Sequence, residues 1–198
     1  GDTKDPGEFV AASAACEDFS ACGGDPEGSW QLEGICVDNP TSQFTSLANN
    51  AAACAGFLTS YEAEAAGGAT LTASGALSGK LSVRHVFGVR ITAACASAIV
   101  GEPLGLSASD CRDLAEGLRR DSGYESASCE LRGDACACSI KAEAEVDLRN
   151  ELQLRESALF DARHSRTYPF CESGDALAVA KVSVGGDLTA TLSFRRRK

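Results

Sequence analysis

The sequence contains no methionine, no C-x-x-C pair and only two histidines, His85 and His164. Metal sites in cysteine-rich proteins usually combine C-x-x-C pairs or histidines at short spacing, so we expect neither a metal nor another cofactor. No apolar run approaches the ~20 residues that a membrane-spanning helix needs, so no transmembrane segment is expected. Because not even position 1 is methionine, we expect a processed product that has lost its export signal, or a fragment.

Cysteine, in contrast, is abundant, with ten residues in a chain of 198. An even number at this density is typical of disulfides formed in an oxidising compartment. We therefore expect five disulfides, no free thiol, and a location outside the cell or on its outer surface. The ten residues are Cys16, Cys22, Cys36, Cys54, Cys95, Cys111, Cys129, Cys136, Cys138 and Cys171.

The net charge is −10, which argues against nucleic acid as a partner because a phosphate backbone requires a basic face. The exception to the acidic character is the C-terminus, which reads Arg195, Arg196, Arg197, Lys198. Removing those four positive charges would bring the net charge from −10 to −14. The contrast between an acidic body and a basic end predicts association between copies of the chain.

Period-two alternation dominates the chain and predicts a mainly β protein. In residues 80–94, one face carries Leu81, Val83, His85, Phe87, Val89 and Ile91. We interpret His85, on this apolar face, as a hydrogen-bonded wall residue. Residues 139–150 alternate apolar and charged side chains, which is typical of an antiparallel strand with one wet face. Further strands are expected at residues 30–37, 61–65, 69–77, 151–159, 167–171, 176–184 and 188–195. Such regular spacing favours a sandwich or a closed barrel.

A hairpin is expected around Gly133 and Asp134. If these two residues form the turn, Cys129 lies opposite Cys138 at a non-hydrogen-bonded site, where the Cβ atoms approach closely enough for a disulfide. Cys136 lies on the same face as Cys138 and must find another partner.

Helical spacing is rarer. A short helix or arm is expected in residues 8–22, and a second helix in residues 41–55. A surface helix is expected to follow the capping pattern that starts at Ser107, and Gly123 would end this helix. A bridge between Cys36 and Cys54 would bracket the second of these helices. The sequence leaves the other connectivities open.

Several cysteine- and glycine-rich segments follow one another in a distinctive order. These are Cys16, CGGD from Cys22, the G-x-W at Gly28, Cys95 and Cys111, GYESASC and GDACAC around the hairpin, and PFCESGDALAV near the end. Together they resemble the lipocalin-like secreted and lipid-anchored proteins of myxobacteria. The resemblance implies a single antiparallel up-and-down β-barrel over residues 22–195, with one or two short surface helices. Residues 1–21 would form an arm and residues 196–198 a basic tail.

The resemblance also bears on single residues. It implies that a cation closes the base of the barrel over Trp30, and the candidate is Arg195 or a neighbouring cation. In many relatives a cysteine of the CGGD type takes lipid directly after the export signal. Here 21 residues precede Cys22, so we expect Cys22 to form a disulfide instead.

No catalytic residue is expected, because a nucleophile needs an adjacent base and the chain has two histidines and oxidised cysteines. We predict a non-catalytic structural subunit of a bacterial extracellular or cell-surface assembly, with itself or other surface proteins as partners. The basic residues 195–198 of one copy would meet an acidic surface of the next, either the N-terminal segment with Asp2, Asp5 and Glu8 or the patch of Glu17 and Asp18. An apolar segment such as Phe9 and Val10 would supply the adhesion, and a contact of this kind would give a filament-like assembly.

The alternative is a lipocalin-type carrier that binds a small hydrophobic ligand in the barrel. The inward positions are often alanine. Small inward side chains could leave a cavity, or they could let other elements pack closely.

Overall fold

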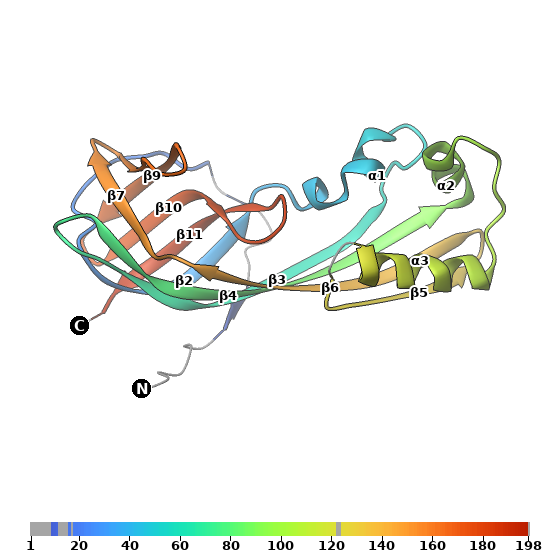
Figure 1. Ribbon diagram of the computed structural model, residues 1–198, viewed down its shortest axis with the longest axis horizontal. Coiled ribbons are helices and arrows are strands. Elements are labelled where there is room, and N and C mark those ends of the chain that lie inside the picture. Colours follow the sequence, from blue (N-terminus) through green and yellow to red (C-terminus); the bar gives the residue numbers. More distant parts are fainter. Residues whose placement is uncertain (1–8, 12–15, 17, 122–123, 198) are drawn as a thin grey trace. The chain divides into compact units, whose positions relative to one another are not determined.

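The computed structural model describes residues 9–11, 16, 18–121 and 124–197, and over these residues the chain is mainly β (Figure 1). The strands are β1 (Val10–Ala11), β2 (Gly28–Val37), β3 (Leu58–Leu71), β4 (Ala76–Thr92), β5 (Ser126–Arg132), β6 (Ala135–Asp147), β7 (Asn150–Arg155), β8 (Ala158–Asp161), β9 (Arg166–Ser173), β10 (Ala176–Ser183) and β11 (Thr189–Arg196). The helices are α1 (Thr45–Asn49), α2 (Ala93–Val100) and α3 (Ala108–Asp121), and a 3-10 helix, η1 (Pro40–Phe44), precedes α1.

The chain divides into two compact units. Unit 1 comprises residues 1–39, 63–83 and 144–198, and unit 2 comprises residues 40–62 and 84–143. Strands β3, β4 and β6 contribute residues to both units. The segment 22–195, for which the resemblance implies a single barrel domain, has residues in both units.

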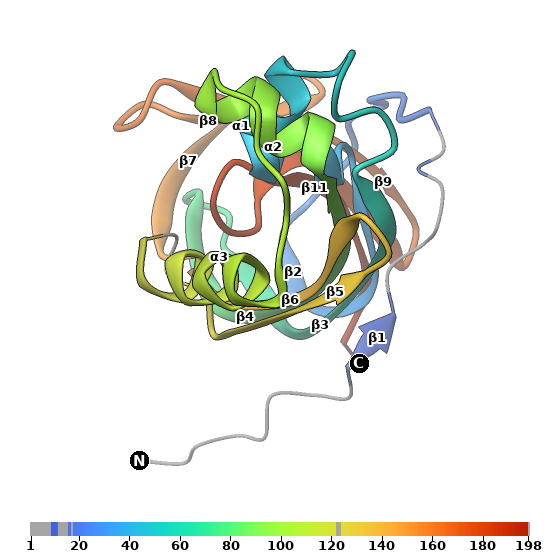
Figure 2. The same ribbon diagram turned by 90° about the vertical axis from the view of Figure 1, so that its right-hand side faces the viewer.

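Unit 1 contains a ring of eight strands. Its pairings run β3, β2, β11, β10, β9, β8, β7, β4, and β4 pairs with β3 again. The pairings of β2 with β11, β10 with β11 and β8 with β9 are antiparallel, which confirms the antiparallel β class expected from the alternating sequence. Figure 2 shows strands of this unit arranged around a common centre.

The pairing between β4 and β7 is short, with two residue pairs, Ala76 with Glu151 and Leu77 with Asn150. The adjoining turn extends it, since the amide of Leu152 donates to the carbonyl oxygen of Gly75 at 2.8 Å. Gly75 has a φ of 86°, and a Cβ at this position would lie 2.0 Å from the carbonyl oxygen of Leu152. Glycine is therefore required for this close approach.

A β-bulge in β10 changes which side chains face inward. Val179 pairs with Leu192 and Val182 with Ala190, so two residues on β10 oppose one on β11. Lys181, inside the bulge, has a φ of 62°. One extra residue reverses the alternation of the strand, so Val179 and Val182 line the same interior although they are three apart.

Some predicted boundaries in unit 1 are wrong. Residues 151–159 form two strands, β7 and β8, because the chain turns at Glu156, whose φ is 47°. The helix expected in residues 8–22 does not form in the described part of that segment. There Val10 and Ala11 form β1, which pairs with Ala65 and Glu64 of β3.

In unit 2, α3 packs beside β5 and confirms the predicted surface helix (Figure 1). The capping pattern forms as expected, with the amide of Asp110 donating to Ser107 Oγ at 3.3 Å and the amide of Ser107 donating to Asp110 Oδ2 at 2.7 Å. Gly123, the expected end of this helix, lies outside the described residues.

Two predictions in unit 2, one of a helix and one of a strand, need correction. The helix expected at 41–55 is limited to η1 and α1, and α1 ends at the poor helix formers Asn49 and Asn50. The strand expected to reach residue 94 ends at Thr92, whose Oγ1 accepts a hydrogen bond from the amide of Cys95 at 3.1 Å. This N-cap starts α2, which the alternation did not predict.

All ten cysteines form disulfides, as expected. The predicted pair between Cys129 and Cys138 is confirmed, on directly opposed residues with Cα atoms 4.0 Å apart. The predicted pair between Cys36 and Cys54 is wrong, because these two residues belong to different units. The other four bridges join Cys16 to Cys36, Cys22 to Cys171, Cys54 to Cys95, and Cys111 to Cys136.

Candidate functional site

Trp30 lies at one side of the interior of unit 1 and is 1% exposed. Its Nε1–H donates to the carbonyl oxygen of Pro26 at 2.9 Å. The cation over its ring is Arg196, whose Cζ lies 4.3 Å from the ring centroid, and not Arg195 itself. A bulge between β2 and β11, where Ser193 pairs with Gly34 but Phe194 with Leu32, shifts the register and brings Arg196 opposite Trp30.

The basic C-terminus is bound within its own chain as far as the structure describes it. Arg195 Nη2 lies 2.8 Å from Glu33 Oε1, and Arg196 Nη1 donates to the carbonyl oxygen of Glu27 at 2.7 Å. Arg197 Nη2 donates to Gln31 Oε1. These contacts lie within unit 1.

The other residues predicted to mediate assembly are only partly described. Val10, in β1, pairs with Ala65 of β3, and the adjacent Phe9 also has an interaction within the chain. Asp18 lies in an irregular segment. Asp2, Asp5, Glu8, Glu17 and Lys198 lie outside the described residues.

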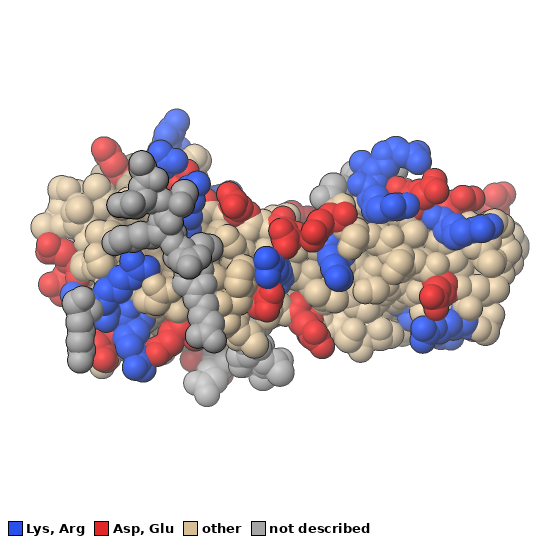
Figure 3. All heavy atoms as spheres, turned by 90° about the horizontal axis from the view of Figure 1, so that it is seen from below, with Lys and Arg blue, Asp and Glu red and all other residues tan. Residues whose placement is uncertain are grey.

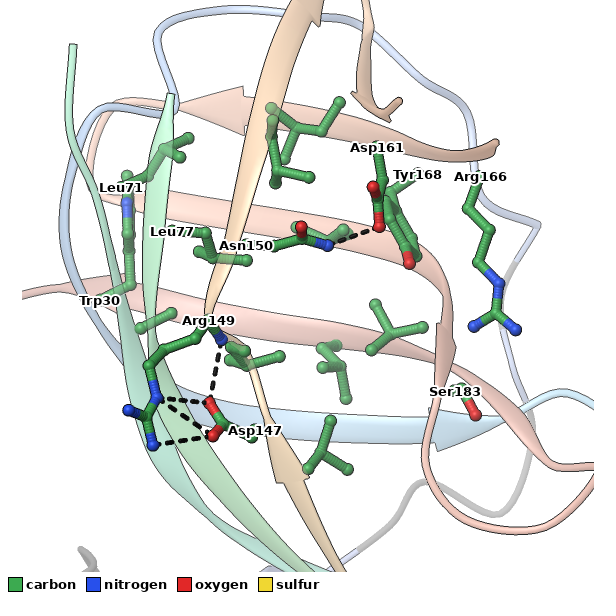
Figure 4. A pocket seen from close by; sticks show the side chains of 18 of the residues that line it. Trp30, Leu71, Leu77, Asp147, Arg149, Asn150, Asp161, Arg166, Tyr168 and Ser183 are labelled. Atoms are coloured by element: carbon green, nitrogen blue, oxygen red, sulfur yellow. Dashed lines mark hydrogen bonds and ion pairs between the residues drawn. The ribbon is translucent and has the colours of Figure 1, made fainter. Parts of the chain in front are cut away.

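A cavity of about 420 Å³ opens inside the ring of unit 1 (Figure 4). Most of its wall is apolar, and the aliphatic part of the wall comes from seven of the strands. The aliphatic lining comprises Ala69, Leu71, Leu77, Val146, Leu148, Leu152, Leu159, Leu177, Val179, Val182 and Leu192. Trp30 completes this apolar wall. Ligand pockets of roughly 300–1,000 Å³ with mainly hydrophobic walls and a few polar groups are typical of small-molecule sites.

One polar group of the wall, Asp161, is 1% exposed and fully hydrogen-bonded. Its Oδ1 accepts from the amides of Arg163 and His164 at 2.9 and 3.1 Å. Its Oδ2 accepts from Asn150 Nδ2 at 2.5 Å and contacts His164 Nδ1 at 2.7 Å. Burial raises the pKa of Asp161, but the hydrogen bonds from His164 and Asn150 outweigh it and lower the pKa to about 2. The carboxylate is therefore ionised, and His164 Nδ1 is the donor.

A second carboxylate of the wall, Asp147, is held by Arg149. The Nε of Arg149 lies 3.2 and 3.1 Å from the two carboxylate oxygens, and its backbone amide donates to Oδ1 at 3.0 Å. The side-chain hydrogen bond from Arg149 lowers the pKa of Asp147. Figure 4 shows this pair below Asn150, on the same stretch of chain.

Three further polar residues face the cavity: Arg166, Tyr168 and Ser183. None of the polar residues of this wall could be recognised as a site from the sequence. One signal was present, since Asp161 shares the parity of Leu159 in a short strand and therefore points to the same face. That parity depends on β8 being separate from β7, which the sequence pattern did not indicate.

Unit 2 holds a separate cluster of aromatic side chains around His85, which is 2% exposed. The hydroxyl of Tyr61 and His85 Nδ1 are 2.8 Å apart, and burial raises the pKa of Tyr61. Phe87 and Phe44 pack edge to face at 5.1 Å. His85 is thus a hydrogen-bonded wall residue, as expected, and belongs to a packed core.

Among the residues that the structure describes, no group of three His, Cys, Asp or Glu side chains is arranged to hold a metal ion. Within the same residues, no helix has the length and apolar character needed to cross a membrane. On the face drawn in Figure 3, both acidic and basic side chains of the described residues are exposed.

Comparison with known proteins adds no functional assignment. No protein-family model matches the chain, and a search of curated proteins finds no relative of it.

Proposed function

We propose that this protein is a non-catalytic carrier that binds a small, largely apolar ligand in the cavity of unit 1. The observation that carries this proposal is the cavity itself, with about 420 Å³ of space and a wall built mainly of leucine and valine. Apolar surface that a ligand removes from water contributes about 25 cal/mol per Å² to binding. The polar groups of the wall would then orient the ligand.

Two further features support this proposal. A ring of eight antiparallel strands has the strand number at which a barrel just encloses one small ligand. Arg196 over Trp30 fits the closed base that a lipocalin-like barrel would have. The five disulfides indicate an oxidising compartment, and we place the carrier outside the cell or on its outer surface.

A structural role in a filament-like assembly has less support. The residues expected to reach a neighbouring copy, Arg195, Arg196 and Arg197, are bound to partners within unit 1. Their charges are therefore less available to direct a contact between copies. If the protein forms large species in light scattering at high concentration, assembly would become the better proposal.

Trp30, the only tryptophan, lines the cavity and provides the assay for the carrier. Titration with decanol, a neutral probe with an aliphatic chain, is expected to change the Trp30 fluorescence in a saturable way. Val179→Phe would place a larger side chain in the cavity and weaken this binding. Ala178→Phe adds the same ring on the other face of β10 and serves as the matched control.

Both variants are first checked by thermal unfolding, because an added ring can destabilise a packed site. If folded Val179→Phe binds decanol as tightly as the parent protein and Ala178→Phe do, the ligand does not occupy this cavity. If the parent protein binds no aliphatic probe at all, the carrier proposal is wrong.

A further inference from the structure

We propose that the ligand of this cavity is an aliphatic acid, whose carboxylate binds Arg166 with the hydroxyl groups of Tyr168 and Ser183 as additional donors. This inference rests on the carrier function and names the chemical class of its ligand. It follows from which polar groups of the wall already have partners and which do not.

The strand register places Arg166 and Tyr168 on the interior face. Arg166 pairs directly with Asp161, and Tyr168 pairs with Leu159. Directly opposed side chains lie on the same face of a sheet, and all four of these residues line the cavity. In Figure 4, Arg166, Tyr168 and Ser183 lie on the side of the cavity away from Trp30, with aliphatic side chains between.

Both carboxylates of the wall are already occupied. Asp161 accepts two hydrogen bonds at each oxygen, which uses its usual capacity. Asp147 is bound by the guanidinium and the backbone amide of Arg149. A ligand with a cationic head group would therefore find no carboxylate that it could bind without breaking an existing bond.

The hydrogen-bond donors of the described wall, in contrast, include groups that have no acceptor. Among the residues that the structure describes, the guanidinium of Arg166 has no acceptor, and the hydroxyl groups of Tyr168 and Ser183 have no hydrogen-bond partner. Arginine presents a fork of N–H donors that matches a carboxylate in two parallel hydrogen bonds. The unused groups thus select an anionic acceptor at this end of the cavity.

The charge of the ligand follows from the same comparison of wall groups that have a partner with those that lack one. Arg166 is the one cation of the described wall that lacks a carboxylate, so one negative charge completes the site. A second negative charge would face the ionised Asp161 without a cation to balance it. A monoanion with an aliphatic body meets both conditions, because the rest of the wall is leucine and valine.

Three probes that share one chain and differ in the head group test this inference: decanoate, decanol and decylamine. At neutral pH we expect the parent protein to bind decanoate about tenfold more tightly than decanol, which corresponds to about 1.4 kcal/mol. Decylamine should bind most weakly. Trp30 fluorescence reports all three.

Arg166→Gln should lose about tenfold in decanoate affinity and leave decanol affinity unchanged. Arg166→Lys keeps the charge but not the fork of donors, and should recover only part of the loss. The matched control is Arg163→Gln, which removes the same charge from the neighbouring turn at a residue that does not line the cavity. It should leave both affinities unchanged.

The outcomes separate the two proposals. If decanol binds but the parent protein does not prefer decanoate, the acid site is wrong and the carrier proposal stands. The same holds if decanol binds and Arg166→Gln and Arg163→Gln lose decanoate affinity equally. Tighter binding of decylamine also overturns the acid site. If none of the three probes binds, the carrier proposal fails and the acid site fails with it.

Discussion

Arg196 lies directly opposite Trp30 in the pairing of β11 with β2, with its guanidinium over the indole ring. The same side chain donates to the carbonyl oxygens of Glu27 and Asp25 at 2.7 and 3.3 Å. Arg196 thus covers the indole ring and also holds residues 25–27, directly before β2, by hydrogen bonds. The neighbouring Arg195 makes an ion pair with Glu33 in which both side chains are about half exposed or more.

Replacing Arg196 by alanine is expected to lower the free energy of unfolding by about 1–3 kcal/mol. The lost terms are a cation–π contact of ~0.5–2 kcal/mol and hydrogen bonds from a charged donor. Arg195→Ala is the matched control and should cost only ~0–1 kcal/mol, because exposed ion pairs contribute little. Urea unfolding of both variants measures the difference, and equal costs would contradict the role assigned to Arg196.

Stability should fall in acid because of Asp161. The pKa of this carboxylate is lowered to about 2 in the folded protein, below the ~3.9 of an unfolded chain. Its ionised form therefore stabilises the fold above about pH 4, and this contribution is lost as the pH falls toward 2. Asp161→Asn should remove the contribution at neutral pH and flatten the pH dependence between these values.

The control for this experiment is Asp175→Asn, since Asp175 is an exposed residue of the turn between β9 and β10. Thermal unfolding of the three proteins across the acid range gives the comparison. If the parent protein and Asp161→Asn lose stability in parallel, the carboxylate does not act as assigned.

Gly75→Ala should destabilise unit 1 at the seam between β4 and β7. A Cβ would meet the carbonyl oxygen of Leu152 at 2.0 Å, and the φ of 86° is unfavourable for alanine. Gly174→Ala shares the positive φ, at 67°, but has nothing within 4 Å of its Cβ position. The control should cost ~1–2 kcal/mol from the backbone alone. Gly75→Ala should cost a further ~1–3 kcal/mol from the clash, measured by chemical unfolding.

Removing the bridge between Cys22 and Cys171 should destabilise the protein more than removing the bridge between Cys129 and Cys138. The first closes a separation of 149 residues and the second only 9. In the chain-entropy account, a longer loop loses more freedom in the unfolded chain, although the other bridges shorten the first loop. The double variants Cys22→Ser with Cys171→Ser and Cys129→Ser with Cys138→Ser, compared by thermal unfolding, test which bridge contributes more stability. The reverse order would mean that native contacts, and not loop length, determine the effect.

Much of the fold could be predicted because its signals are local. Leu81 to Ile91 alternate as expected, since one face of β4 is buried and a strand repeats every two residues. The bridge between Cys129 and Cys138 was predictable because a two-residue turn at Gly133 determines the register of the whole hairpin. Helix α3 carries its start signal in Ser107 and Asp110, within one turn of the chain.

The candidate site was much less predictable. Asp161, Arg166 and Tyr168 come together only because β8 and β9 form a hairpin with that register. Val182 reaches the cavity only through the bulge in β10. Whether the alanines of the inward faces would leave a cavity or a packed core depends on all the strands at once.

The β class and the oxidised cysteines could be predicted from the sequence alone, because strand alternation repeats every two residues and a high, even number of cysteines is typical of disulfides. The tertiary structure decided which cation covers Trp30, which partner each of Cys36 and Cys54 takes, and which polar groups of the cavity are left unused. Each of these depends on the register between strands that are distant in the chain. A single bulge, such as the one between Ser193 and Phe194, shifts that register by one residue.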